Sequence, residues 1–370
     1  MVSRGCFAIV MRLTSYVKKM YLCRKISTMA ENATSEPVKM PGKYELIADL
    51  AKFFPVENAS TVVGPGDDAT VTDSDGNQTV TSSKVFIENV HFDLTYFPLR
   101  HLGYKLATVA FADVLAMNAA PSQLLVNIAV SDRFDLKMVN EILSGVGACC
   151  ETVHADLAGL DLTTSPRELV ISMTAVGECE PARLCTRKGA AENELICVSG
   201  DFAAAYTGLL LLEREKKVFE KNPGVQPDFT GKDYLLRRQI KPEPRIDIIE
   251  KLRQEEILPT AMANVCEGLA TAAIQICRAS KKGCVLFEEK LPMTELTFVT
   301  LKDLDIVHTV AALNGGDDYE LMFTIKQSDF EKIKKVENVS IIGYIKEESA
   351  GYQLITGDNM QVPLRAQGFN

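Results

Sequence analysis

Residues 99–118, LRHLGYKLATVAFADVLAMN, combine a long apolar stripe with one carboxylate inside it. Apolar side chains recur every three or four positions, which predicts an amphipathic helix: Leu102, Leu106, Val109, Ala110, Val114 and Met117. Asp113 falls on the same stripe, beside Ala110 and Met117. A lone buried carboxylate is costly, so Asp113 needs an ion-pair partner, a capping role or a metal ion.

The segments around this helix alternate between strand and helix patterns. Before and after it, the β-rich runs 79–87 and 168–176 predict strands, and 43–54 and 135–154 predict further helices. In the second half, strands are expected at 194–200, 284–289, 319–325 and 339–345, and helices at 202–217, 267–280 and 328–335. We interpret the loop 222–232 between them as a moving lid. This alternation predicts α/β or α+β layers, and 370 residues favour two domains.

The composition is that of an ordinary soluble globular protein, with 46% hydrophobic and 24% charged residues. A net charge of −9 argues against nucleic-acid binding through phosphate neutralisation. No run of 18 apolar residues occurs, so no membrane span is expected. Ten cysteines without a CxxC pair favour reduced thiols in a cytoplasmic protein over a zinc site or a disulfide scaffold.

The first thirty residues are basic and contain no acid. They have the composition of an organellar transit peptide. The simpler alternative is an upstream start codon, with Met29 or Met40 opening the functional chain. In either case we expect residues 1–40 to form a disordered leader outside the fold.

Carboxylates gather where apolar segments meet turns. Asp67 and Asp68 follow two glycines in VGPGDDATV (63–71), and a second Gly-Asp-Asp occurs in ALNGGDDYELMF (312–323). Asp161 follows LAGL at the end of a helical pattern. Taken alone, VGPGDDATV is more simply interpreted as a solvated turn. Together they suggest oxygen ligands for Mg²⁺, which binds proteins through a few carboxylates plus substrate phosphates. No Walker A or GxGxxG motif occurs, so a nucleotide site would be of another kind.

Seven stretches, in order, resemble the thiamine-monophosphate kinase family from about residue 43 to residue 370. They are VGPGDDA (63–69), VHFDLTYFPLRHLGYKLATVAFADVLAMNAAP (90–121), DLAGLDLTTS (156–165), CTRKGAAENELICVSGDFAAAYTGL (185–209), NVCEGLATA (264–272), NGGDDYELMF (314–323) and AQGF (366–369). Each motif alone is weak, but seven in the family's order are specific.

The resemblance implies ATP-dependent phosphorylation of thiamine monophosphate to thiamine diphosphate, with Mg²⁺. It implies the fold of aminoimidazole ribonucleotide synthetase: an N-terminal α/β domain at 41–180 that binds ATP and metal ions, and a C-terminal α/β domain at 181–370. The N-terminal sheet would pair with that of a second copy in a homodimer β-barrel.

Site residues follow from the resemblance as well. It implies metal binding by Asp67, Asp113, Asp161 and Glu267. It implies ATP contacts from Asp161, Arg187 and Cys266. It implies substrate contacts from His91, Asp317 and Phe369.

Several positions depart from the family's pattern at the phosphate end. Ser82, Ser83 and Lys84 replace Thr-Thr-Asp, so a metal carboxylate becomes a cation. Leu160 replaces a glycine that lets backbone approach phosphate, and Asn264 replaces an aspartate. These changes, which also leave the role of Asp68 uncertain, predict fewer bound Mg²⁺ ions.

Three functions stay open on the sequence alone. One is a working thiamine-monophosphate kinase with a reduced metal cluster. The second is a non-catalytic relative that binds nucleotide or thiamine phosphate, or that serves as a dimer partner. The third and weakest is another superfamily member, such as a synthetase that activates an amide or selenide with ATP.

Overall fold

The computed structural model describes residues 43–52, 56, 58–74 and 76–366. The chain divides into two compact units, residues 1–55 with 370, and residues 56–369. In the first, the described segment is helix α2 (Lys43–Ala51), where the sequence predicts a helix over 43–54. The expected leader and Phe369 lie outside the described residues.

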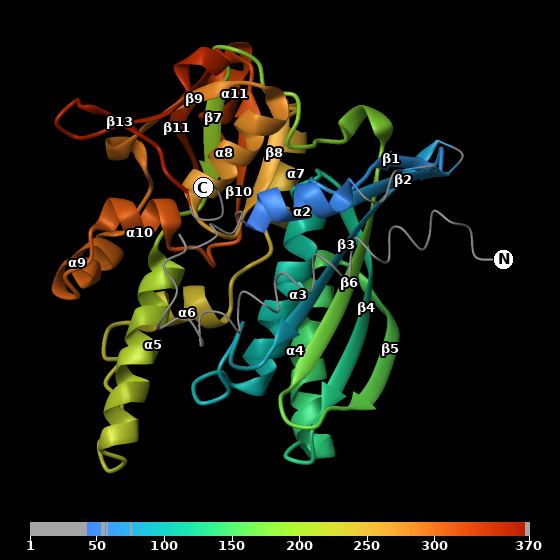
Figure 1. The fold of residues 1–370 in the computed structure, drawn as a ribbon, viewed down its shortest axis with the longest axis vertical. Helices are drawn as coiled ribbons and strands as arrows, with labels where there is room; N and C mark the ends of the chain where they lie inside the picture. Colours follow the sequence, from blue (N-terminus) through green and yellow to red (C-terminus); the bar gives the residue numbers. More distant parts are fainter. Residues whose placement is uncertain (1–42, 53–55, 57, 75, 367–370) are drawn as a thin grey trace, which may run out of the picture. The chain divides into compact units, whose positions relative to one another are not determined.

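The second unit contains a six-stranded sheet, in the order β1-β2-β3-β6-β4-β5. Its strands are β1 (Thr61–Val63), β2 (Thr70–Ser74), β3 (Asn77–Ile87), β4 (Ala120–Val130), β5 (Asp156–Thr164) and β6 (Val170–Cys179). Helices α3 (Leu99–Leu115) and α4 (Leu136–Val153) lie side by side along this sheet (Figure 1). Alternate residues of β6, such as Ile171, Met173 and Ala175, are buried in the core between this sheet and the helices.

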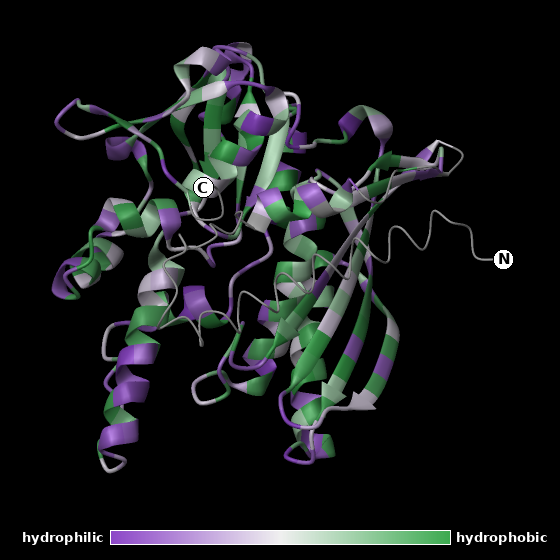
Figure 2. Cartoon of the chain, viewed as in Figure 1, coloured by the Kyte–Doolittle hydropathy of each residue, from purple (hydrophilic) through white to green (hydrophobic). Residues whose placement is uncertain are grey.

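The same unit contains a seven-stranded sheet, in the order β13-β12-β9-β11-β7-β10-β8. Its strands are β7 (Leu195–Ser199), β8 (Ala261–Val265), β9 (Gly283–Phe287), β10 (Glu320–Ile325), β11 (Val339–Lys346), β12 (Tyr352–Ile355) and β13 (Gln361–Pro363). The helices of this half are α5 (Ala204–Lys221), α6 (Asp233–Ile240), α7 (Ile246–Gln254), α8 (Leu269–Ser280), α9 (Glu295–Asp303), α10 (His308–Asn314) and α11 (Phe330–Ile333). Its central strands and α8 are largely hydrophobic, whereas the C-terminal half of α5 is mostly hydrophilic (Figure 2). The expected α/β architecture is therefore confirmed.

One expectation about an individual element was wrong, and one strand was missed. Residues 156–164, read as the end of a helical pattern, form strand β5, and β4 was not predicted. Strand β5 lies at the sheet edge and is exposed along most of its length, so its sequence lacks the alternation that marks a half-buried strand.

Helix α3 is also more deeply buried than an amphipathic stripe predicts. Every residue from Leu102 to Leu115 is buried. The reason is that α3 contacts α4 and α6 as well as strands of both sheets. A helix enclosed on several sides needs no polar face.

The strands of the first sheet all lie within 61–179 and those of the second within 195–363. The proposed boundary at 180/181 falls between these groups and stays a prediction. Within the described residues, none of the helices has the length and hydropathy needed to span a membrane.

Candidate functional site

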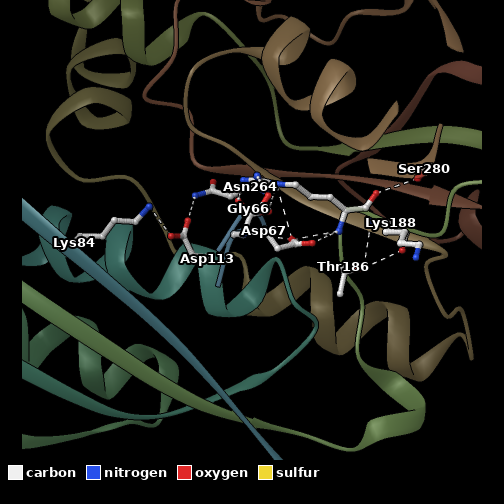
Figure 3. A network of polar contacts seen from close by, with 10 residues as sticks. Gly66, Asp67, Lys84, Asp113, Thr186, Lys188, Asn264 and Ser280 are labelled. Carbon is white, nitrogen blue, oxygen red and sulfur yellow. Dashed lines mark hydrogen bonds and ion pairs between the residues drawn. The ribbon is translucent and has the colours of Figure 1, made fainter. Parts of the chain in front are cut away.

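Helix α3 places Asp113 at the centre of a buried polar network (Figure 3). The Lys84 Nζ lies 2.5 Å from Asp113 Oδ2, and Ser82 Oγ donates to the same oxygen at 2.8 Å. Asn264 Nδ2 donates to Asp113 Oδ1 at 2.8 Å. Burial works to lower the pKa of the Lys84 ammonium, but the Asp113 carboxylate holds that pKa above its usual value. Lys84 therefore balances the charge of Asp113, and Ser82 and Asn264 donate hydrogen bonds to its oxygens.

Arg187 neutralises the Gly-Asp-Asp turn in a similar way. Its Nη2 and Nε donate to the two carboxylate oxygens of Asp68 at 2.6 and 3.1 Å. Its backbone N–H donates to Asp67 Oδ2 at 3.1 Å, and its Nη1 donates to the Gly66 carbonyl at 3.1 Å. Burial raises the pKa of Asp68 to about 6 despite the facing guanidinium. This bidentate geometry fixes the turn against the segment that carries Arg187.

Asn264 joins the two halves of this network. Its side chain contacts Asp113, while its backbone N–H donates to Asp68 Oδ2 at 3.4 Å. Figure 3 shows Asn264 between Asp113 and the Gly66–Asp67 turn. We call Asp67, Asp68, Asp113, Lys84 and Arg187 the charge cluster. It combines three carboxylates with two cationic side chains.

The charge cluster does not fit a bound Mg²⁺ ion as it stands. Across the part of the chain that the structure describes, no three His, Cys, Asp or Glu side chains are arranged to hold a metal. Mg²⁺ requires near-octahedral oxygen coordination, but both Asp113 oxygens and both Asp68 oxygens already accept from protein donors. The positions that would ligate a cation are occupied by Lys84 and Arg187.

A cavity of about 610 Å³ opens beside the same helix. Its walls are largely aromatic, from Phe86, Phe92, Tyr96, Phe97 and Tyr319. Its polar lining includes His91, Asp93, Lys105, Glu213, Lys216, Gln239 and Asp317. Aromatic side chains beside several charged groups suit a small ligand that carries both flat rings and charges.

Asp317 is the most heavily bonded group of this cavity. Lys105 Nζ lies 2.9 Å from its Oδ2, Gln239 Nε2 donates to Oδ2 at 3.1 Å, and the Tyr319 hydroxyl donates to Oδ1 at 2.7 Å. Burial works to raise the pKa of Asp317, but Lys105 and these donors hold that pKa below its usual value. Lys105 also donates to the Gln239 carbonyl at 2.8 Å, which ties α6 to the cavity floor.

His91 lies at the cavity with one ring nitrogen already used. The backbone N–H of Ile87 donates to His91 Nδ1 at 3.0 Å, so Nδ1 acts as an acceptor. The other nitrogen, Nε2, therefore carries the proton in the neutral ring and can donate to a ligand.

Two elements connect the cavity to the charge cluster. On α3, Lys105 and Val109 line the cavity and Asp113 lies in the cluster, at successive intervals of four residues. Eight residues of helix span about 12 Å. On the other side, the Asp317 N–H donates to the Cys266 carbonyl at 2.8 Å, next to Asn264. Gly316 makes this approach possible, because its φ is +78° and a Cβ there would lie 2.8 Å from that carbonyl.

Comparisons with known proteins identify related sequences and folds. The family model for the AIR synthase related protein, N-terminal domain, matches residues 66–179. The thiamine-monophosphate kinase of Bacillus subtilis is 30% identical over 326 residues, 85% of this chain and 95% of that protein.

The chain belongs to the thiamine-monophosphate kinase family.

A second family member, from Synechococcus elongatus, is 29% identical over 335 residues, 89% of this chain and 95% of its own length. A solved structure of AaThiL complexed with AMPPCP and TMP superposes with a TM-score of 0.73 at 24% identity, covering 89% of this chain and 97% of that one. This likeness to AaThiL supports the fold.

Asp161 is separated from the charge cluster that its expected role would share. It is exposed on the edge strand β5. Across the sheet it stands in one row with Asn127 on β4, Ser172 on β6 and Val85 on β3, so these side chains share a face. Val85 points to the opposite face of the sheet from its neighbour Lys84. Within one chain, two strands, β6 and β4, therefore separate Asp161 from β3, and Asp161 lies on the other face from Lys84. Its role stays a prediction.

Cys266, Glu267 and Ser83 lie nearer to the charge cluster in the sequence, since they follow Asn264 or adjoin Lys84. Cys266 and Glu267 are half-buried in the turn after β8, and burial raises the pKa of the Cys266 thiol to about 12. Ser83 lies on the opposite face of β3 from Ser82, with its hydroxyl 2.9 Å from that of Thr174. Site roles for these residues stay predictions.

Sequence reasoning missed Lys105, Gln239 and Tyr319. A signal existed for Lys105, because a lysine stands eight residues before Asp113 within the apolar helix. Nothing in the sequence marked Gln239, which reaches Asp317 from 78 residues away.

Proposed function

We propose that this protein transfers the γ-phosphoryl group of ATP to thiamine monophosphate, forming thiamine diphosphate and ADP. The observation that carries the proposal is the aromatic cavity around Lys105 and Asp317, joined by α3 to a charge cluster. Membership of a family whose Bacillus subtilis member is a thiamine-monophosphate kinase supports it.

The cavity has the groups that the acceptor needs. Thiamine monophosphate carries two flat rings, one of them cationic, and a phosphate. The aromatic walls would stack on the rings, and the acidic side chains Asp93, Glu213 and Asp317 would attract the cationic ring. His91 would donate to the phosphate, and Lys105 and Lys216, which pair with Asp317 and Asp93, would add positive charge beside it.

The charge cluster would take the nucleotide end. Phosphoryl transfer asks the protein mainly to position the reactants and neutralise phosphate charge. Lys84 and Arg187, paired with Asp113 and Asp68, would offset carboxylate charge that would otherwise repel the triphosphate. The acceptor phosphate would attack the γ-phosphorus in line. The reaction class implies Mg²⁺ bound with ATP, but we assign it no ligand in the charge cluster, because Asp68 and Asp113 already accept from protein donors.

We further propose a homodimer in the cytoplasm, formed through the first sheet. Strand β5 is an edge strand, and its Leu157, Leu160 and Leu162 are exposed. Val85 and Leu125 add exposed apolar area on the outer sheet face. An uncovered apolar edge is a template for pairing with another strand. Pairing would also bring Asp161 close to a second chain.

A second function is favoured by the same cluster. Because Lys84 and Arg187 already pair with Asp113 and Asp68, the chain could bind nucleotide and thiamine monophosphate without turnover. Such a non-catalytic relative would keep the cavity and lose only the reaction.

One experiment separates the two functions. The purified full chain is incubated with ATP and thiamine monophosphate, and thiamine diphosphate is measured by chromatography. We expect its formation in the wild type, a large loss in Lys105→Met, and none with unphosphorylated thiamine. Lys282→Met, which removes a partly exposed ion pair with Glu192 outside the cavity, is the matched control. Binding of thiamine monophosphate without any product would favour the non-catalytic function.

A further inference from the structure

The pairing of Lys84 with Asp113 is built into the core of the first sheet. Lys84 lies on β3, which pairs with β2 on one side and with β6 on the other. Its partner residue on β6, Met173, is buried, so Lys84 points to the helix-covered face, toward Asp113. The Asp113 side chain is 2% exposed and that of Lys84 is 33% exposed. The strand therefore directs the Lys84 side chain toward a carboxylate that is almost fully buried.

The ligands around the ammonium are those that a hard cation would use. Asp113 offers two carboxylate oxygens, and Ser82 offers a hydroxyl oxygen. The side-chain Oδ1 of Asn264 is buried and has no hydrogen-bond partner in the structure. Carboxylate, hydroxyl and amide oxygens are the donors that Mg²⁺ and Mn²⁺ prefer.

We propose that the Lys84 ammonium serves as a permanent counter-cation for Asp113 and fills the place of a divalent metal ion. The charge of Asp113 is met by the protein itself, so this part of the cluster needs no metal. The role of Lys84 beside ATP rests on the proposed function, because the lysine would then replace one of the metal ions that accompany the nucleotide. The role of Lys84 in the nucleotide-free protein rests only on its contacts with Asp113 and the neighbouring oxygens.

Removing the ammonium should create a metal site. Without Lys84, Asp113 would be a buried carboxylate with no charge partner, a strongly unfavourable state. A divalent cation could then enter between Asp113, Ser82 and Asn264. The chain would change from one that ignores divalent cations at this position to one that is stabilised by them.

The test uses Mn²⁺ as the probe and the nucleotide-free full chain. Bound Mn²⁺ is counted by electron paramagnetic resonance, and the thermal unfolding midpoint is measured in EDTA and in Mn²⁺. Lys84→Ala should bind one more Mn²⁺ than the wild type, at least tenfold more tightly than any wild-type binding at this site. Its midpoint should be lower than that of the wild type in EDTA and should recover in Mn²⁺.

Three controls make the outcome decisive. Lys84→Arg keeps a cation and should behave like the wild type. Lys282→Ala removes a partly exposed lysine that pairs with Glu192, outside the charge cluster, and should gain no Mn²⁺. Asp113→Asn, combined with Lys84→Ala, should abolish the new site.

Two results would overturn the inference. One is a wild-type chain that binds Mn²⁺ tightly and loses it on Asp113→Asn. The other is a folded Lys84→Ala chain with no gain in Mn²⁺. If Lys84→Ala does not fold, the gain in bound Mn²⁺ is measured on Lys84→Gln instead, and the wild-type measurement stands unchanged. Thiamine diphosphate formation is measured separately, so failure of the proposed function and failure of this inference are distinguishable.

Discussion

At the scale of single residues, the site is organised by pairs of opposite charge that are distant in sequence. Lys105 meets Asp317, Lys84 meets Asp113, and Arg187 meets Asp68. The sequence identified the acids, because each interrupts an apolar segment or a turn. It did not identify the pairs, because the partners come from different elements, up to 212 residues apart for Lys105 and Asp317.

Replacing Asp317 should weaken both binding and folding. Asp317→Asn leaves the Lys105 ammonium, which is 4% exposed, without its charge partner. We expect a loss of about 2–3 kcal/mol in the free energy of unfolding, below the range for fully buried pairs because Asp317 opens into the cavity. Urea unfolding at pH 7 measures it. A loss under 0.5 kcal/mol would contradict the assigned ion pair.

The stability lost in Asp317→Asn should depend on pH. The pKa of Asp317 in the folded chain lies below its usual value of 3.8, so its stabilising effect is complete above that value and fades as the pH falls through the lower folded value. The difference in unfolding free energy between wild type and Asp317→Asn should therefore be constant from about pH 5 to 7 and shrink below about pH 4. Urea titrations across this range measure it, and a difference that grows on acidification would refute the prediction.

At the scale of elements, helices α3 and α4 approach closely through two glycines. A Cβ on Gly103 would lie 1.9 Å from the Ile142 carbonyl oxygen, and one on Gly145 would lie 1.8 Å from that of Arg100. This contact fixes α3, which carries both Lys105 and Asp113. The position of α3 therefore sets the spacing between cavity and charge cluster.

Gly145 and Gly147, both on α4, provide a matched pair of substitutions. Gly145→Ala should destabilise the fold by about 2 kcal/mol, because overpacking against the backbone of α3 exceeds the gain in helix propensity. Gly147→Ala, two residues further on, meets nothing within 4 Å and should be neutral or stabilising by up to about 1 kcal/mol. Thermal unfolding of both variants measures the difference, and equal effects would contradict the close packing.

Sequence patterns predicted the buried elements best. The helices at 99–118 and 135–154 and the strands at 79–87 and 168–176 correspond to α3, α4, β3 and β6. Their hydrophobic periodicity reflects burial on a defined face. Strand β5 was missed because exposure removes that periodicity, and the full burial of α3 was missed because it depends on contacts with α6 and β8.

At the scale of the whole molecule, the proposed dimer would cover the exposed edge strand. The chain has a mass of 40.6 kDa, so light scattering of the purified protein should give twice that value. Leu160→Lys places a charge on an edge residue that is 53% exposed in the single chain, and it should shift the protein toward the monomer without unfolding it. A wild-type chain that stays monomeric at micromolar concentration would refute this assembly.

The central claim is that one chain couples the Lys105–Asp317 cavity to the charge cluster in order to phosphorylate thiamine monophosphate. Phosphorus NMR of the full chain with ATP and thiamine monophosphate follows every phosphate at once. The account predicts that thiamine diphosphate and ADP appear in equal amounts while thiamine monophosphate disappears. ATP consumption that leaves thiamine monophosphate unchanged, or no change in either compound, would contradict it.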